Sequence, residues 1–297
     1  MKIFDCFMYF DEEVVLDLRL NTLNEFVDYF VVIESKFTHK GDLRDLKFNH
    51  KKFEKFKDKI IYLVYEQVPN EIEIINPNDS EEEKSRKYIF NATYRENGQR
   101  NYIEKGLHHA GEDDIILISD VDEIPNLLSV NFSKINEKII LFKQDMFYYK
   151  FNLHLPDIIW TGTKGCKKKH LISPQWLRNI KDRKYPFYRI DTLFSKNKYK
   201  SIKYINTGGW HFTNIKTAQE IQHKLKSYLH HREFDVNPLS VDQINKIINN
   251  KKTVYNLNVD KSANKFENGN KLEKFEFNKL PSYLRENKDN FKDWIDN

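Results

Sequence analysis

Short apolar runs alternate with helical patterns in the first half of this 297-residue chain. Runs with the length and character of buried strands occupy residues 3–8, 29–33, 60–64 and 115–118. Between the first two runs, apolar residues recur at helical spacing, at Leu16, Leu20, Leu23 and Val27. Buried runs separated by helices favour a mainly parallel sheet. We therefore expect an α/β, Rossmann-like fold whose ligand site lies beyond the carboxyl ends of the strands.

Capping boxes mark the starts of further helices. They pair Ser80 with Glu83, Thr217 with Glu220 and Ser240 with Gln243. We expect the first of these helices to run through a polar stretch as far as residue 109, and the other two to lie near the C-terminus. Strands are also expected at residues 139–142 and 146–151, and loops within the irregular stretch 154–200. One domain, residues 1–255, should be followed by an appendage, residues 256–297, that is packed on it or partly disordered.

Composition narrows the class of protein. Apolar residues make up 39% of the chain, and the net charge of +5 arises from 49 basic and 44 acidic residues spread along it, which predicts no nucleic-acid partner. Cys6 and Cys166 lie far apart and indicate neither a disulfide framework nor a zinc site. The sequence has no apolar stretch long enough to cross a bilayer, so we expect a soluble, cytoplasmic protein. The sequence does not fix its oligomeric state.

An acidic cluster follows the apolar run at residues 115–118. Asp120, Asp122 and Glu123 stand where this strand leaves the sheet, and Pro125 prevents its continuation as a central strand. Asp120 and Asp122 share one face of an extended segment, and in a tight turn both carboxylates can converge on one ion. A few carboxylates leave coordination positions of Mg²⁺ or Mn²⁺ open for phosphate oxygens. The cluster therefore favours a metal bound together with a diphosphate ligand.

Two other interpretations of the cluster stay open at this point. Acidic residues often cap a helix or solvate a turn, although carboxylates at the end of a buried strand are costly unless a cation or donors compensate them. An apolar strand followed by Asp-x-Asp also occurs in phosphohydrolases of the haloacid dehalogenase type, in which Asp120 would be the nucleophile and Asp122 the acid/base. Ile124 and the position of the motif well inside the chain make this second interpretation weaker.

Five sequence blocks, in this order, resemble glycosyltransferase family 17. They occupy residues 32–41, 46–48, 95–101, 113–125 and 208–212. The resemblance implies a GT-A fold, a nucleotide-sugar donor, a divalent metal such as Mn²⁺ or Mg²⁺, and inversion at the anomeric carbon. It further implies transfer of N-acetylglucosamine from UDP-GlcNAc to a glycan acceptor. The best-known members have a membrane anchor, whereas this chain begins almost directly at its first strand, which suggests a compact microbial or viral member.

The resemblance also assigns roles within the site. Asp120 is expected to approach the ribose or the metal, and Asp122 is the expected principal metal ligand beneath the diphosphate. His211 resembles the downstream histidine that completes the metal shell in many GT-A enzymes, and glycines 208 and 209 would permit the close backbone approach that places it. The alternative is a structural histidine packed against Trp210.

Other residues are candidates for binding the two substrates. Glu34, at the end of a strand, and Arg100, on the long helix, are candidates for the nucleotide pocket, with ion pairs as the alternative. Lys164 opens a basic run that would neutralise the departing diphosphate, unless this run is a solvated loop. Trp160 and Trp176 flank the run and are candidates for stacking on the acceptor sugar, with ordinary packing as the alternative.

An inverting transfer needs a general base that removes the proton of the acceptor hydroxyl. Asp145, just after the strand expected at residues 139–142, is the first candidate, followed by Asp191 and Asp157. A non-catalytic sugar-binding protein is a third class of interpretation, beside the transferase and the phosphohydrolase. The five ordered blocks favour the transferase.

Overall fold

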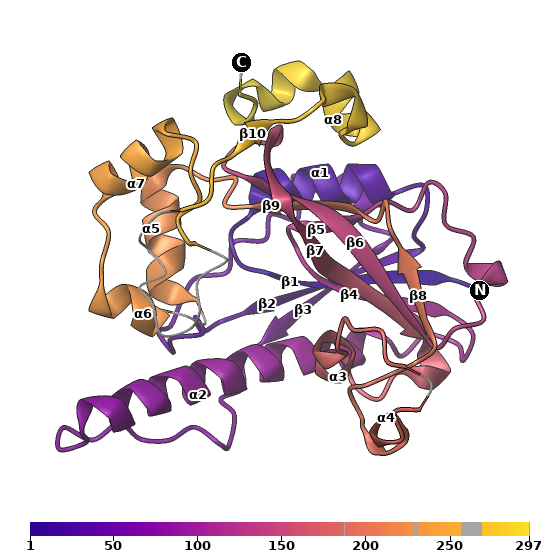
Figure 1. The fold of residues 1–297 in the computed structure, drawn as a ribbon, viewed down its shortest axis with the longest axis horizontal. Coiled ribbons are helices and arrows are strands. Elements are labelled where there is room, and N and C mark those ends of the chain that lie inside the picture. The colour runs from indigo at the N-terminus through magenta and orange to yellow at the C-terminus, as the bar shows by residue number, and fades with distance from the viewer. Residues whose placement is uncertain (187, 229–230, 257–268, 297) are drawn as a thin grey trace.

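A computed structural model describes residues 1–186, 188–228, 231–256 and 269–296. Its strands form one mixed sheet in the order β3-β2-β1-β4-β7-β6-β9-β5, and β8 and β10 pair with β6 and β7 (Figure 1). The strands are β1 (Ile3–Tyr9), β2 (Tyr29–Ser35), β3 (Ile60–Tyr65), β4 (Ile115–Asp120), β5 (Glu123–Pro125), β6 (Ile139–Tyr148), β7 (Leu153–Lys167), β8 (Ile202–Ile205), β9 (Gly209–Thr213) and β10 (Glu273–Lys274).

The α-helices lie on both sides of this sheet. They are α1 (Glu13–Leu23), α2 (Glu81–Asn101), α3 (Pro174–Asn179), α4 (Asp191–Phe194), α5 (Ala218–Ser227), α6 (His231–Val236), α7 (Val241–Asn249) and α8 (Ser282–Glu286). The three predicted capping boxes are present at the starts of α2, α5 and α7, where each cap side chain accepts a hydrogen bond from the backbone N–H three residues later.

The strands β3, β2, β1 and β4 are parallel, and their carboxyl ends meet at one edge of the sheet. At this edge Met8 of β1 lies opposite Asp120 of β4, and Tyr9 lies opposite Glu34 of β2. The prediction of an α/β fold with a mainly parallel, Rossmann-like sheet is confirmed. The arrangement is consistent with the GT-A type.

The other half of the sheet is mixed. β7 pairs antiparallel with both β4 and β6, and β6 pairs in parallel with β8 along its first half and with β9 along its second half. The irregular stretch does contain segments without regular structure, such as residues 181–186, but its first part, residues 154–167, belongs to β7. The middle of β7 is partly exposed, so its polar and aromatic residues give no clear alternation. The strand expected at 146–151 ends at Tyr148, because Tyr149 turns the chain with φ 63°.

Alternate residues of the parallel strands face two cores. Phe7 and Leu117 belong to the core beneath α1, while Phe4 and Ile116 belong to the core on the α2 and α3 side. A third core packs α5 and α7 against the end of β6. Figure 1 shows α1 above the sheet and α2 and α3 below it. None of the helices in the described ranges is long and apolar enough to span a bilayer.

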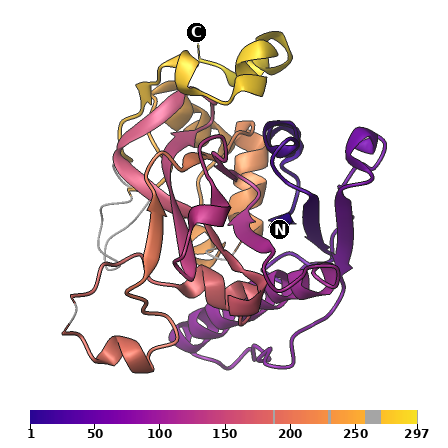
Figure 2. The same ribbon diagram turned by 90° about the vertical axis from the view of Figure 1, so that its right-hand side faces the viewer.

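The C-terminal segment returns to the first core. Leu280, Leu284 and Phe291 are buried together with residues of α1, and both views show this segment above α1 (Figures 1 and 2). Residues 257–268 of the predicted appendage lie outside the described residues. The domain boundary at residue 255 stays a prediction.

Candidate active site

A pocket of about 220 Å³ opens where the carboxyl ends of β1, β2 and β4 meet. Asp120 and Asp122 line it from the end of β4, and His211 lines it from β9. The helices α2 and α5 contribute Glu96 and Lys224. This location follows the rule that open α/β sheets bind ligands beyond the carboxyl ends of their strands. The structure thus brings together the three side chains that the sequence predicts for the metal.

Arg19 of α1 holds the turn after β4 from within the protein. Its Nη1 donates to the carbonyl oxygens of Asp120, Val121 and Glu123, at 3.1, 3.2 and 2.8 Å. Its Nε and Nη2 bind the two carboxylate oxygens of Asp5, at 2.8 and 2.5 Å, and both side chains are completely buried. Three carbonyl groups that point into the protein are therefore satisfied by one guanidinium, and the backbone of the acidic turn is fixed.

The carboxylate of Asp120 lies between two arginines. Arg100 of α2 donates to Oδ1 at 3.1 Å, and Arg178 of α3 donates to Oδ2 at 3.0 Å. Burial raises the pKa of Asp120, but Arg178 and Arg100 lower it by more, so that this carboxyl group has a pKa well below its usual range. Asp120 is therefore ionised near neutral pH, and each of its oxygens already accepts a hydrogen bond from the protein.

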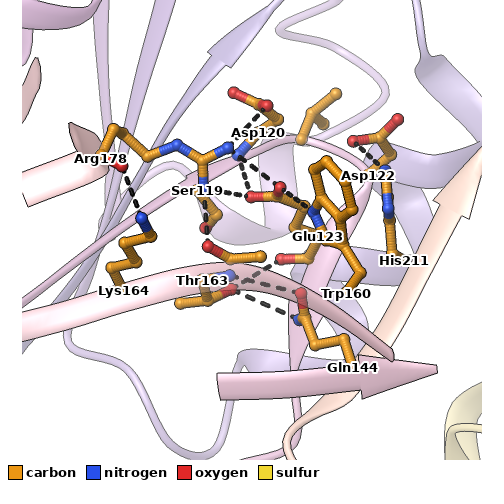
Figure 3. Close-up of polar contacts among 12 residues, drawn as sticks. Ser119, Asp120, Asp122, Glu123, Gln144, Trp160, Thr163, Lys164, Arg178 and His211 are labelled. Atoms are coloured by element: carbon orange, nitrogen blue, oxygen red, sulfur yellow. Dashed lines mark hydrogen bonds and ion pairs between the residues drawn. The ribbon is translucent and has the colours of Figure 1, made fainter. Parts of the chain in front are cut away.

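Glu123 lies fully buried behind Asp120, and Figure 3 shows the guanidinium of Arg178 reaching both acids. The carboxylate of Glu123 accepts two hydrogen bonds from Arg178, at 2.7 and 3.0 Å. It accepts one from the indole N–H of Trp160 at 2.7 Å and one from the backbone N–H of Asp120 at 2.9 Å. Four donors thus compensate this buried charge, which gives Glu123 a positioning role within the turn.

The carboxylate of Asp122 faces two other groups. Nε2 of His211 lies 3.5 Å from its Oδ1, and Nζ of Lys224 lies 3.8 Å from its Oδ2. Burial raises the pKa of Asp122, but His211 and then Lys224 lower it by more, and the net shift is downward. Burial lowers the pKa of His211, but Asp122, followed by Glu123 and Asp120, raises it, and the net shift is upward. The pairing of Glu123 with His211 between β5 and β9 brings the histidine to this carboxylate.

Asp122 and His211 are side chains of this pocket with donor atoms suited to a divalent metal, and the role of Asp120 as a further ligand stays a prediction. The described residues contain no group of three or more His, Cys, Asp or Glu side chains arranged for a metal ion. However, Mg²⁺ is commonly bound by one or two carboxylates together with substrate phosphates and water. His211 also keeps a buried Nδ1 that has no hydrogen-bond partner among the described residues. A carboxylate and an imidazole are suitable ligands for Mn²⁺, so the donor set fits a metal shared with a diphosphate.

Glu34 binds protein groups around the loop that follows β2. Its carboxylate accepts hydrogen bonds from Arg44 at 2.9 Å, from the Tyr62 hydroxyl at 2.8 Å, and from the backbone N–H groups of Lys47 and Phe48 at 2.6 and 3.0 Å. Other residues of this loop, including Arg44, line the pocket. Glu34 thus shapes one wall of the pocket through the loop.

Lys164 supports the helix that carries Arg178. Its Nζ donates to the carbonyl oxygens of Arg178 and Ile180, at 2.5 and 2.8 Å, where α3 ends. Burial, and next the neighbouring Arg178, lowers the pKa of Lys164 to about 8. The ammonium group therefore interacts with protein carbonyls in this structure, and a contact with diphosphate stays a prediction.

The two tryptophans predicted for the acceptor differ in position. Trp160 stands beside the site, where its ring centroid lies 5.2 Å from that of His211 (Figure 3). Trp176 is buried in the core on the α2 side, and its indole N–H donates to the carbonyl oxygen of Lys196 at 2.7 Å. Among the described residues that line the pocket, neither tryptophan is present. Their role in acceptor binding stays a prediction.

The three aspartates predicted as the general base lie outside the described lining of the pocket. Asp145 of β6 is in register with Trp210 of β9, so it shares the sheet face of Trp210, whereas the next residue, His211, is on the opposite face. Asp157 is exposed on β7, and Asp191 pairs with two basic side chains of its own segment. The identity of the base stays a prediction.

Sequence reasoning missed two carboxylates that do line the pocket, Glu12 and Glu96. Glu12 follows β1 and accepts hydrogen bonds from the backbone N–H groups of Phe10 and Asp11, at 3.2 and 3.1 Å. Glu96 of α2 accepts one from Arg100 at 2.7 Å. The four-residue spacing of Glu96 and Arg100 on a helix is a sequence signal that predicts this pair, whereas Glu12 belongs to no motif.

The fold and the pocket together define an α/β protein of the kind that binds its ligand at the carboxyl edge of a parallel sheet. Comparison with known families gives the particular group. The sequence model of glycosyltransferase family 17 matches residues 1–295, and the chain belongs to this family.

Curated relatives agree with this assignment. The chain is 26% identical over 228 residues to the β-1,4-mannosyl-glycoprotein 4-β-N-acetylglucosaminyltransferase of Homo sapiens and, likewise, to that of Rattus norvegicus. The enzyme of the same name from Mus musculus is 25% identical over 228 residues. Each match covers 72% of this chain and 40% of the relative. The chain therefore spans less than half the length of these relatives.

Proposed function

We propose that this protein is an inverting, metal-dependent glycosyltransferase that moves N-acetylglucosamine from UDP-GlcNAc to a glycan acceptor. The observation that carries the proposal is the convergence of Asp120, Asp122 and His211 on one pocket at the carboxyl edge of the sheet. Membership of glycosyltransferase family 17 favours this function over a phosphohydrolase or a non-catalytic sugar-binding protein. The relatives' names support N-acetylglucosamine as the transferred sugar.

Asp122 and His211 would hold Mn²⁺ or Mg²⁺, and a bound metal would neutralise charge on the diphosphate leaving group. Asp120 is suited to a different task, because Arg100 and Arg178 already engage both of its oxygens. Its carboxylate is fixed at the pocket wall, where it can accept a hydrogen bond from a ribose or sugar hydroxyl. Arg100 thereby contributes to the donor pocket indirectly, by orienting Asp120.

In the transfer, the acceptor hydroxyl oxygen forms a bond to the anomeric carbon, and the bond from that carbon to the β-phosphate oxygen breaks. The electron pair of the broken bond stays on the diphosphate, and a carboxylate takes the acceptor proton. We propose to identify this base by comparing Asp145→Asn with Glu12→Gln and Glu96→Gln. Removal of the base is expected to lower kcat by a factor of about 10²–10⁴.

Calorimetry with UDP and UDP-GlcNAc, with and without Mn²⁺, tests the binding part of the proposal. Binding should be much tighter with the metal, and Asp122→Ala should remove this dependence on metal. Asp113→Ala is the matched control, because Asp113 is exposed and pairs with Lys169. If the wild-type protein binds UDP equally with and without metal, metal dependence is refuted. If it binds neither nucleotide, the proposed function is wrong.

A product assay tests the chemistry. Incubation with UDP-GlcNAc and an N-glycan acceptor should yield UDP and a β-linked N-acetylglucosamine, which NMR of the product identifies by its anomeric coupling. Replacing UDP-GlcNAc by UDP-galactose or UDP-glucose tests the donor. An α-linked product would contradict inversion, and faster transfer of another sugar would contradict the assigned donor.

A further inference from the structure

Lys224 is a pocket residue for which the sequence predicts no role. It lies on α5, whose start is fixed by the capping box of Thr217 and Glu220. Ile221 and Leu225 of the same helix are buried in the third core. Because the helix is anchored at its start and along its buried face, the position of Lys224 at the pocket wall is set by packing.

The ammonium group of Lys224 stands between two carboxylates of the pocket. Its Nζ lies 3.7 Å from Oε1 of Glu12 and 3.8 Å from Oδ2 of Asp122. An unperturbed lysine side chain is protonated at neutral pH, and two carboxylates beside it favour this charged form. A second cation-forming group, His211, faces the other oxygen of Asp122.

Both distances are too long for a hydrogen bond from Lys224. An ammonium group has three N–H donors, and within the described part of the chain none of those of Lys224 has an acceptor in reach. The side chain is 21% exposed and lines the pocket. Unused donors and a positive charge at a pocket wall are suited to an anion with several oxygens.

We propose that Lys224 donates hydrogen bonds to the diphosphate of the nucleotide-sugar donor. This inference rests on the proposed function, because it takes the nucleotide sugar as the ligand of the pocket. Glu12 and Asp122 hold the ammonium in place, and the diphosphate replaces water at its donors. Lys224 then fixes the leaving group from the α5 side of the pocket, while Asp122 and His211 lie next to it.

Binding of UDP and of uridine to three proteins tests this role. The proteins are the wild type, Lys224→Met and the control Lys226→Met, which changes an exposed lysine on the same helix. Loss of a charge-assisted contact to phosphate should weaken UDP binding by a factor of about 10–100. Uridine lacks phosphate, so its affinity should change less than twofold. Lys226→Met should bind both ligands as the wild type does.

A further variant separates contact with phosphate from simple charge compensation. Lys224→Met removes one positive charge beside Glu12, and the excess negative charge would by itself repel UDP. In Lys224→Met/Glu12→Gln the charge balance is restored, but the donors to phosphate are still missing. We expect UDP binding to stay at least about tenfold weaker than in the wild type. Lys224→Arg, which keeps charge and donors, should recover part of the loss.

Three outcomes would overturn the assignment. Wild-type affinity of Lys224→Met for UDP would show that Lys224 does not touch the ligand. Full recovery in the double variant would show that Lys224 only neutralises Glu12. An equal loss of UDP and uridine affinity would show that the substitution disturbs the pocket as a whole. In each of these cases the wild type still binds UDP with Mn²⁺, so the proposed function survives; absence of that binding overturns both.

Discussion

Replacing Arg19 by methionine should both destabilise the protein and loosen the acidic turn. The side chain is completely buried and forms a two-pronged ion pair with Asp5. Removing one partner of a buried pair leaves an uncompensated charge and typically costs about 3–5 kcal/mol. The variant also leaves the carbonyl groups of Asp120, Val121 and Glu123 without this donor. We therefore expect the free energy of unfolding to fall by at least about 4 kcal/mol.

A double variant separates these two contributions. In Arg19→Met/Asp5→Leu the unpaired carboxylate is gone, so part of the lost stability should return. The three carbonyl groups still lack the guanidinium of Arg19, so binding of UDP with Mn²⁺ should remain weak even where the double variant is fully folded. Urea denaturation measures the stability, and calorimetry of the folded fraction measures the binding. The control is Arg86→Met, which removes an exposed ion pair between Arg86 of α2 and Glu73. It should change neither the stability nor the nucleotide binding.

Two results would contradict this prediction. A loss of stability below about 1 kcal/mol in Arg19→Met would mean that the Asp5 pair is not desolvated as the burial indicates. Normal nucleotide binding in the double variant would mean that the turn keeps its shape without Arg19. The second result would leave the ion pair as a structural feature without influence on the site.

Three further predictions concern stability around the site. Burial lowers the pKa of Lys164 from 10.5 to about 8, so between these two pH values the unfolded state binds more protons than the folded state. The free energy of unfolding should therefore rise with pH across this range. Measured by urea titration, the rise should exceed that of Lys164→Met by up to about 3 kcal/mol. Gly209→Ala should cost at least about 2 kcal/mol in the same assay, because Gly209 has φ +121° and an added Cβ would lie 2.1 Å from the carbonyl oxygen of Ile124; an unchanged midpoint would contradict this. Glu34→Gln leaves Arg44 without its buried carboxylate and should lower the free energy of unfolding by about 1–3 kcal/mol, whereas a change within error would show that the loop after β2 does not depend on this acid.

The elements that the sequence predicts well are those with local signals. The runs that form β1, β2, β3 and β4 are apolar throughout because these parallel strands are covered on both sides. Each capping box is complete within four residues and needs no tertiary information. The sequence does not predict β7, because the middle of this strand is partly exposed and because its partner β4 is distant in sequence. Such long-range pairing leaves no periodicity that a reader of the sequence can use.

The residues of the site also divide into those with a local sequence signal and those that depend on distant partners. The acidic turn is predictable because an apolar strand and the acids that end it are adjacent in the sequence. Arg19 has a weak signal, a charged residue directly between Leu18 and Leu20 in an apolar helix. Arg178 has none, because it lies 55 residues from Glu123 in a segment without regular spacing. Contacts between such distant residues depend on how α3 packs against the sheet.

The same contacts determine how the charges of the acidic turn are compensated. Carboxylates at the end of a buried strand need compensation, and a metal ion is one way to provide it. In the structure, Arg178 and Arg100 compensate Asp120, and Arg178 together with Trp160 and the backbone compensates Glu123. Two of the three acids are therefore stable without any metal. Asp122 differs, because its neighbours His211 and Lys224 stand at 3.5 and 3.8 Å, beyond the usual length of a hydrogen bond to its oxygens. Substitution of Asp122 should accordingly affect metal binding more than folding, whereas substitution of Glu123 should affect folding first.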